Sequence, residues 1–147
     1  MDKTGRVNSM SLSNEEIVQI LYDNPLEGLD YQDGLNRFGG QASIYLRIVN
    51  TFIESTPALL AELTKVTPET MAEYTVRIHG LKGSCYGISA TVLGDEAKAL
   101  ELASKIFDWD TIQRDNPLVI EHAQTLINQL QSVMDKVEEL AGQPAVS

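Results

Sequence analysis

Apolar residues in the last third of the chain recur at alternating steps of four and three, and this pattern strongly restricts the possible folds. In an α-helix such spacing gathers the side chains into one stripe along a single face. A shorter row with the same spacing lies mid-chain, and no segment shows the alternation of a half-buried strand. The sequence therefore predicts an all-α fold. The rows are Val119, Ala123, Leu126, Leu130, Val133, Val137 and Leu140, and Tyr74, Ile78, Leu81, Cys85 and Ile88.

Two short helices are expected near the N-terminus. Ser13 and Glu16 have the spacing of a capping box at the start of the first, which should end at Asn24. Asp30 can cap the second, which should run through Phe38.

A long helix is expected from about residue 42 to 65, where Pro57 should kink or break it. Another should start at Thr67, a capping residue followed by proline at the first helical position, and end near residue 88. These two helices would supply half of a helical core.

Two further helices complete the prediction. Ser89 can cap a helix over residues 90–107. Residues 107–115 should form a loop containing Trp109, and Asn116-Pro117 should open the last helix. Trp109 is expected to cover one end of the core or to contact a partner.

Four substantial helices with short connections favour an antiparallel four-helix bundle, with the two short N-terminal helices packed across it or capping one end. Residues 13–141 would form one domain. Residues 1–12 are expected to be a flexible arm, and residues 142–147 a flexible tail.

Charge and cysteine content narrow the classes of function. The net charge of −10 disfavours direct binding to nucleic acid or an anionic membrane surface. The single cysteine fits a reducing compartment. The sequence has no long apolar run and no signal segment, so a cytoplasmic location is expected. We expect a monomer, because no apolar stripe is left over.

His79 lies on the predicted helix over 68–88, away from the apolar row, and should point outward. Lys82 follows three residues later on the same side, where an ammonium group can hold a phosphate. A neutral imidazole nitrogen is a nucleophile suited to phosphoryl transfer. The pair taken alone also fits an ordinary surface histidine beside an ordinary lysine.

Three glycines share the exposed side of this helix: Gly80, Gly83 and Gly87. Each costs about 0.5–1 kcal/mol relative to alanine. They indicate a surface that a partner's backbone can approach, with Tyr86 contributing to its apolar rim. The alternatives are a merely weak helix and close packing against a neighbouring helix.

The segment Ile78-His79-Gly80-Leu81-Lys82-Gly83-Ser84 resembles the central motif of histidine-containing phosphotransfer (HPt) domains, which reads histidine, any residue, leucine, lysine, glycine and a small residue. Further pieces match in order, and the resemblance covers roughly residues 27 to 137. They are Gly34 to Gly40, Tyr45, Phe52, Ile88-Ser89-Ala90 and Leu100-Glu101.

The resemblance implies a four-helix bundle in which His79 accepts a phosphoryl group from a receiver-domain aspartate and passes it to another receiver. It implies that Lys82 assists the phosphate and that Gly83 keeps the docking surface open. Ser89 replaces the family's usual glycine, and Gly80 is unusual at its variable position.

Such a protein is a carrier, not an enzyme. The resemblance implies that receiver domains or a hybrid sensor histidine kinase are the partners, and that Mg²⁺ belongs to the receiver, so no cofactor is expected on this chain. The sequence has no glycine-rich phosphate loop and no kinase signature. One alternative is a helical adaptor that binds a receiver or kinase without carrying phosphate, and another is an enzyme with His79 as general base.

The remaining candidate residues are interpreted structurally. His122, at the edge of the last helix's apolar row, is expected to be a surface or structural histidine. His79, His122 and Cys85 lack metal-ligand spacing. Cys85 should pack in the core, and the pairs Asp95-Glu96 and Glu138-Glu139 should be solvated.

Overall fold

The structure, a computed structural model, describes residues 12–142, and all regular structure in that part is helical. The prediction of an all-α fold is therefore confirmed there. Most of the predicted arm and tail, residues 1–11 and 143–147, lies outside the described residues. The elements are α1 (Asn14–Asp23), α2 (Tyr31–Asn36), α3 (Ala42–Leu63), a 3-10 turn η2 (Pro68–Thr70), α4 (Met71–Gly87), α5 (Thr91–Lys105) and α6 (Trp109–Ala141).

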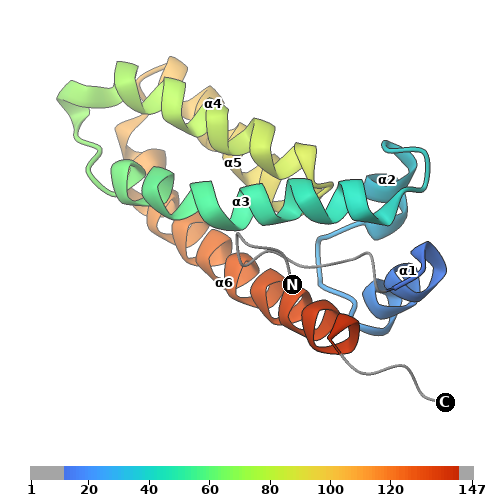
Figure 1. The fold of residues 1–147 in the computed structure, drawn as a ribbon. Helices are drawn as coiled ribbons and strands as arrows, with labels where there is room; N and C mark the ends of the chain where they lie inside the picture. The colour runs from blue at the N-terminus through green and yellow to red at the C-terminus, as the bar shows by residue number, and fades with distance from the viewer. Residues whose placement is uncertain (1–11, 143–147) are drawn as a thin grey trace, which may run out of the picture.

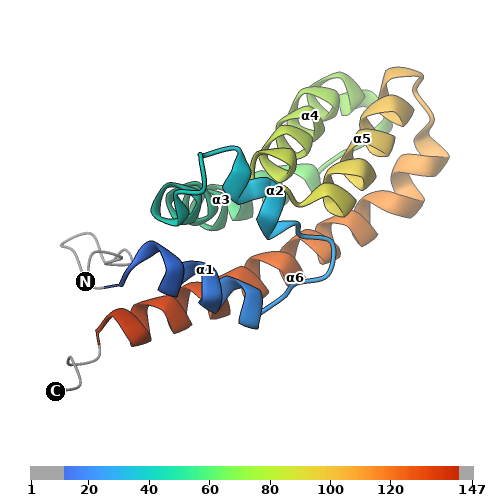
Figure 2. The same ribbon diagram turned by 90° about the vertical axis from the view of Figure 1, so that its right-hand side faces the viewer.

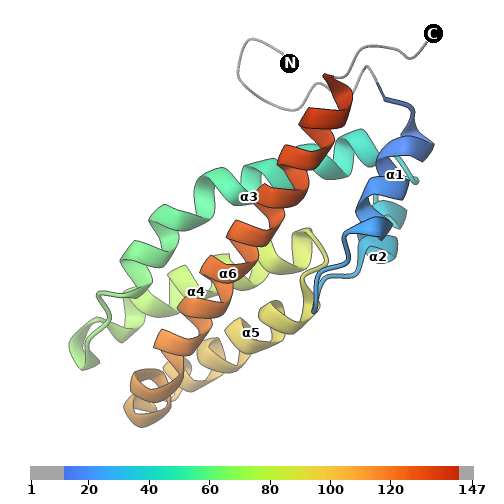
Figure 3. The same ribbon diagram turned by 90° about the horizontal axis from the view of Figure 1, so that it is seen from below.

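The four long helices contact one another in sequence around a shared core. α4 packs along α5, α5 against α6, α6 against α3, and α3 against α4 (Figure 1). The pairing of α4 with α5 is the most extensive, and the two lie side by side in Figure 2. α6 runs the length of the molecule, and α1 and α2 lie at the end where α3 begins and α6 finishes (Figure 3).

Helix starts follow local capping chemistry. Ser13 Oγ accepts from the Glu16 backbone N–H at 3.1 Å, and the Glu16 carboxylate accepts from the Ser13 N–H at 3.0 Å. Asp30 Oδ1 accepts from the backbone N–H of Asp33 at 3.0 Å and starts α2. Both caps were predicted, because both partners are near in sequence.

The predicted start of the last helix is wrong. α6 begins at Trp109 after the cap Asp108, so the expected loop over 107–115 is mostly helix and Pro117 lies inside α6. The Asn116 side chain does not cap a helix. It accepts from Tyr74 Oη at 2.8 Å and donates to the Leu63 carbonyl at 3.0 Å. These buried bonds join α3, α4 and α6 and help to hold the helix through the proline.

Pro57 also lies inside a continuous helix, so the predicted break in α3 does not occur. A proline removes one intrahelical hydrogen bond, which destabilises an isolated helix. Ile53 and Leu60 are buried on either side of it. Their packing keeps both halves of α3 in register against the core.

Ser89 does not cap α5, and that prediction is wrong. Ala90 occupies the N-cap position, while Ser89 has a φ of 63° in the left-handed region. Its buried hydroxyl donates to Asp33 Oδ2 at 2.7 Å. The short turn between α4 and α5 requires a left-handed residue, where the resemblance expects glycine. Serine there costs about 1 kcal/mol, which its bond to Asp33 offsets.

The two apolar rows face the core as predicted. Every member of the mid-chain row is at most 2% exposed, and the C-terminal row is buried except for Leu140. Leu140 is 41% exposed, one residue before α6 ends. Within residues 12–142, no helix is both long and apolar enough to cross a bilayer.

Candidate functional site

The core-facing row of α4 leaves His79 on the outer side of the helix. Its side chain is 65% exposed, as the sequence predicts. Lys82 lies one turn further along, and its side chain is 23% exposed because it leans toward α5. The helix therefore presents an imidazole to solvent while holding the neighbouring ammonium group against the protein.

Glu101 of α5 joins these residues. One carboxylate oxygen lies 2.7 Å from His79 Nδ1, and the other lies 2.7 Å from Lys82 Nζ. Lys105, one turn further along α5, brings its ammonium nitrogen to 3.5 Å from the oxygen that faces His79. We call His79, Lys82, Glu101 and Lys105 the His79 site.

The carboxylate of Glu101 is only 6% exposed. Its hydrogen bond from Lys82 lowers its pKa most, burial opposes that shift, and His79 and Lys105 lower it further, to about 2. Glu101 is therefore ionised at neutral pH and can only accept hydrogen bonds. His79 Nδ1 must donate its proton to Glu101, which leaves Nε2 with a free lone pair in the neutral ring.

Small polar side chains fix the register of α4 against α5 beneath the site. The hydroxyls of Thr75 and Ser104 are 2.7 Å apart, and Ser104 Oγ donates to the Glu101 carbonyl at 2.8 Å. Ser104 is buried. These bonds hold the backbone of Glu101 in place, which restricts the position of its carboxylate.

The three glycines on the exposed side of α4 are not required by packing. A Cβ added at Gly80, Gly83 or Gly87 would meet no atom within 4 Å. Close packing against a neighbouring helix, one of the alternatives considered for them, is therefore wrong. Gly94 of α5 differs, because a Cβ there would lie 2.4 Å from Tyr86 Cε1.

Tyr86 leans over α5. Its hydroxyl donates to Asp95 Oδ1 at 2.5 Å, and its half-buried ring covers Gly94. Asp95 is exposed, as predicted, and it also accepts the hydrogen bond that fixes the ring. Tyr86 borders the glycine face of α4, and its predicted part in partner binding stays a prediction.

Two other candidates have structural positions. Cys85 is fully buried, as predicted, and burial raises the pKa of its thiol to about 12. It is therefore a poor nucleophile near neutral pH. Trp109 is half-buried at the start of α6 and packs against the core. Among residues 12–142, no three histidine, cysteine or acidic side chains converge as a metal site.

The sequence identified His79 and Lys82 but gave no role to Glu101 or Lys105. Glu101 appeared only as part of the Leu100-Glu101 match. A glutamate followed by lysine four residues later is a recognisable helix pair, so Lys105 could have been found. The contact between Glu101 and His79 spans 22 positions and depends on how α4 packs on α5.

Comparisons of the chain with family models, curated proteins and solved structures found no match.

Proposed function

We propose that this chain is a histidine phosphotransfer protein of a multistep phosphorelay, with His79 as the residue that carries the phosphoryl group. The proposal includes an antiparallel four-helix bundle of the HPt type for α3 to α6. One observation supports it above the others: Glu101 holds His79 Nδ1 at 2.7 Å while the ring stays largely in solvent.

The Nδ1 bond determines which nitrogen reacts. With its proton on Nδ1, His79 offers the Nε2 lone pair to an incoming aspartyl phosphate. A bond forms between Nε2 and phosphorus as the bond from phosphorus to the acyl oxygen breaks, and the electron pair returns to the receiver's aspartate. The ring becomes positively charged, and the ionised Glu101 stabilises that charge through Nδ1–H.

The charges around His79 suit an anionic group. The carboxylate of Glu101 pairs with two ammonium groups, those of Lys82 and Lys105. These three groups together carry a net charge of about +1. A phosphoryl group on Nε2 would attract either ammonium nitrogen as a point charge. Phosphoryl transfer depends mainly on alignment and charge stabilisation, which this arrangement can supply.

The exposed side of α4 supports docking of a folded partner. Gly80, Gly83 and Gly87 carry no side chain there, and a Cβ added at any of them would meet no atom within 4 Å. A receiver domain that approaches there would supply its own acidic pocket and Mg²⁺. This chain would then be a carrier, with the partner supplying the remaining chemistry.

The test uses receiver domains charged with radiolabelled phosphate. The full chain should acquire an acid-labile, base-stable label, which His79→Gln abolishes and His122→Gln leaves intact. Helical circular dichroism of both variants controls for folding. Undiminished labelling of His79→Gln would reject His79 as the carrier. Stable receiver binding by the wild-type chain with no label on it would favour the adaptor.

A further inference from the structure

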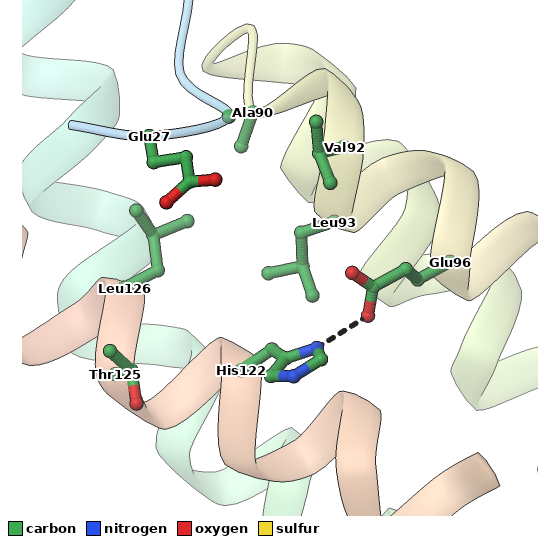
Figure 4. Close-up of a pocket in the computed structure, with 9 residues that line it drawn as sticks. Glu27, Ala90, Val92, Leu93, Glu96, His122, Thr125 and Leu126 are labelled. Carbon is green, nitrogen blue, oxygen red and sulfur yellow. Dashed lines mark hydrogen bonds and ion pairs between the residues drawn. The ribbon is translucent and has the colours of Figure 1, made fainter.

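A second histidine–glutamate pair borders a groove between the loop that follows α1, the start of α5 and the middle of α6. The groove has a volume of about 320 Å³. Ala90, Leu93 and Leu126 give it an apolar lining, and His122 and Glu96 form one edge (Figure 4). His122 Nδ1 lies 2.7 Å from Glu96 Oε2.

The charge of this groove is negative. Glu96 and Glu27 reach it from opposite sides (Figure 4), and no lysine or arginine among residues 12–142 lines it. The carboxylate of Glu27 has no hydrogen-bond or ion-pair partner among residues 12–142. Figure 4 shows it extending from the loop into the space beside Leu126. Two carboxylates beside an apolar surface suit a cation that is carried on an aliphatic stem.

The loop that forms one wall is held in place. Gly28 has a φ of +81°, and a Cβ there would lie 3.1 Å from Val92 Cβ. The backbone N–H of Asp30 donates to the Ser89 carbonyl at 3.0 Å. Because close packing and a backbone bond fix the loop, the groove exists before any ligand binds.

The rim is open and partly apolar. His122 is 54% exposed at its side chain, and Val92, which lines the groove from the start of α5, is 54% exposed. Leu118, one turn before His122 on α6, is 50% exposed. A small molecule would be left largely in water here, whereas a side chain projecting from a polypeptide would add contacts to this rim.

We infer that this groove, the His122 groove, binds a lysine or arginine side chain of a partner polypeptide, with flanking apolar residues on Val92 and Leu118. The cation would pair with Glu96 and Glu27 while its stem lies on Leu93. The chain's net charge of −10 would draw a basic partner toward it. This inference does not depend on the proposed function of His79.

The probe is the peptide acetyl-Leu-Arg-Leu-amide, titrated into the full-length chain and followed by amide chemical shifts. Amides of Val92, Glu96 and His122 should shift, and those of Gly80 and Gly83 should not. The citrulline analogue keeps the shape but lacks the charge, and should bind at least fivefold more weakly. Equal binding by the two peptides would overturn the inference.

Variants distinguish binding in the groove from general attraction of the peptide to the negatively charged protein. Glu96→Gln and Glu27→Gln should each lower the affinity for the arginine peptide by about fivefold. Glu121→Gln removes the same charge from the exposed side of α6 and should have no comparable effect. An equal loss in Glu121→Gln would contradict a specific site. If agmatine bound as tightly as the peptide, the assignment to a polypeptide would be overturned. The His79→Gln variant should bind the peptide with wild-type affinity, because the groove is separate from the His79 site.

Discussion

His79 and His122 both place Nδ1 2.7 Å from a glutamate of α5, yet their surroundings differ in charge and burial. Glu101 is 6% exposed and meets Lys82 and Lys105, whereas Glu96 is 31% exposed. The His122 groove instead contains a second carboxylate, Glu27, and in the described part of the chain no ammonium group lines it. The first region suits an anion, and the second suits a cation.

The comparison shows what a histidine–carboxylate pair decides by itself. In both regions it can fix which ring nitrogen carries the proton. The charges around the pair then determine which ligand is favoured. For this reason His79 and His122 are proposed to have unrelated roles, although their hydrogen bonds have the same length.

The largest expected difference between the two regions appears when each glutamate is replaced by alanine and phosphoryl transfer is measured. Glu101→Ala should slow phosphoryl transfer to His79 by about 30–100-fold, because it removes the group that orients the ring and stabilises its charge. Glu96→Ala should leave the rate unchanged. Single-turnover transfer from a labelled receiver measures both.

Glu101→Gln is the matched variant, since its amide oxygen can still accept from Nδ1–H while its amide nitrogen replaces the oxygen that accepts from Lys82. It should retain a rate within about tenfold of wild type. If it were as slow as Glu101→Ala, an acceptor for Nδ1–H would not be sufficient, and the role of Glu101 would lie in its charge and its bond to Lys82.

Acid unfolding isolates the buried carboxylate. The pKa of Glu101 is lowered to about 2, so folding favours its ionised form. Its contribution to stability is present above about pH 4.5 and is lost as the pH falls toward 2. The free energy of unfolding should fall by about 1–2 kcal/mol more for wild type than for Glu101→Gln, because exposed partners reduce the full linkage effect.

Denaturant titrations between pH 6 and pH 2.5 measure that difference. Glu121→Gln, which removes a charge from an exposed position, controls for net charge. Parallel profiles for wild type and Glu101→Gln would contradict the ion-pair role of Glu101.

Replacing Lys82 tests whether an ammonium group near His79 contributes to phosphoryl transfer, as the comparison of the two regions predicts. Lys82→Ala should slow transfer by about fivefold and change receiver affinity less, since its contact with the phosphoryl group develops during transfer. Lys136→Ala, on α6, is the control for losing a lysine. A change in affinity alone would assign Lys82 to docking.

The smallest expected effect concerns the glycines. Gly83→Ala should raise the free energy of unfolding by roughly 0.5–1 kcal/mol, because a methyl group there meets nothing within 4 Å. Receiver-dependent transfer should become slower in the same variant. Gly28→Ala, at the His122 groove, should instead destabilise the fold, because its φ of +81° disfavours a side chain.

Thermal or denaturant unfolding and labelling of the two glycine variants check this contrast. Unchanged transfer by a stabilised Gly83→Ala would remove the proposed docking role of that glycine.

The parts of the fold that could be predicted depend on nearby residues. The apolar rows placed α4 and α6 facing the core, and Ser13 with Glu16 marked the start of α1. The start of α6 was missed because a local signal, Asn116-Pro117, resembled a helix opening. What keeps α6 helical there includes bonds from Asn116 to Tyr74 and Leu63, which are distant in sequence.

The same distinction applies to the site. His79 and Lys82 lie three positions apart on one helix, so their proximity follows from helical geometry. Glu101 becomes their partner only through the packing of α4 on α5. Likewise, the left-handed backbone of Ser89 follows from the turn between those helices and its bond to Asp33, which the serine side chain alone does not predict.

The Asn116 side chain has a consequence for how the molecule opens. Its hydrogen bonds to Tyr74 and to the Leu63 carbonyl connect α6 to α4 and α3 at one buried point. If any one of these helices separates there, at least one of the two hydrogen bonds breaks and leaves polar atoms on the remaining helices without a partner. The backbone amide protons of Tyr74 and Asn116 should therefore exchange with solvent deuterium only when the three helices separate.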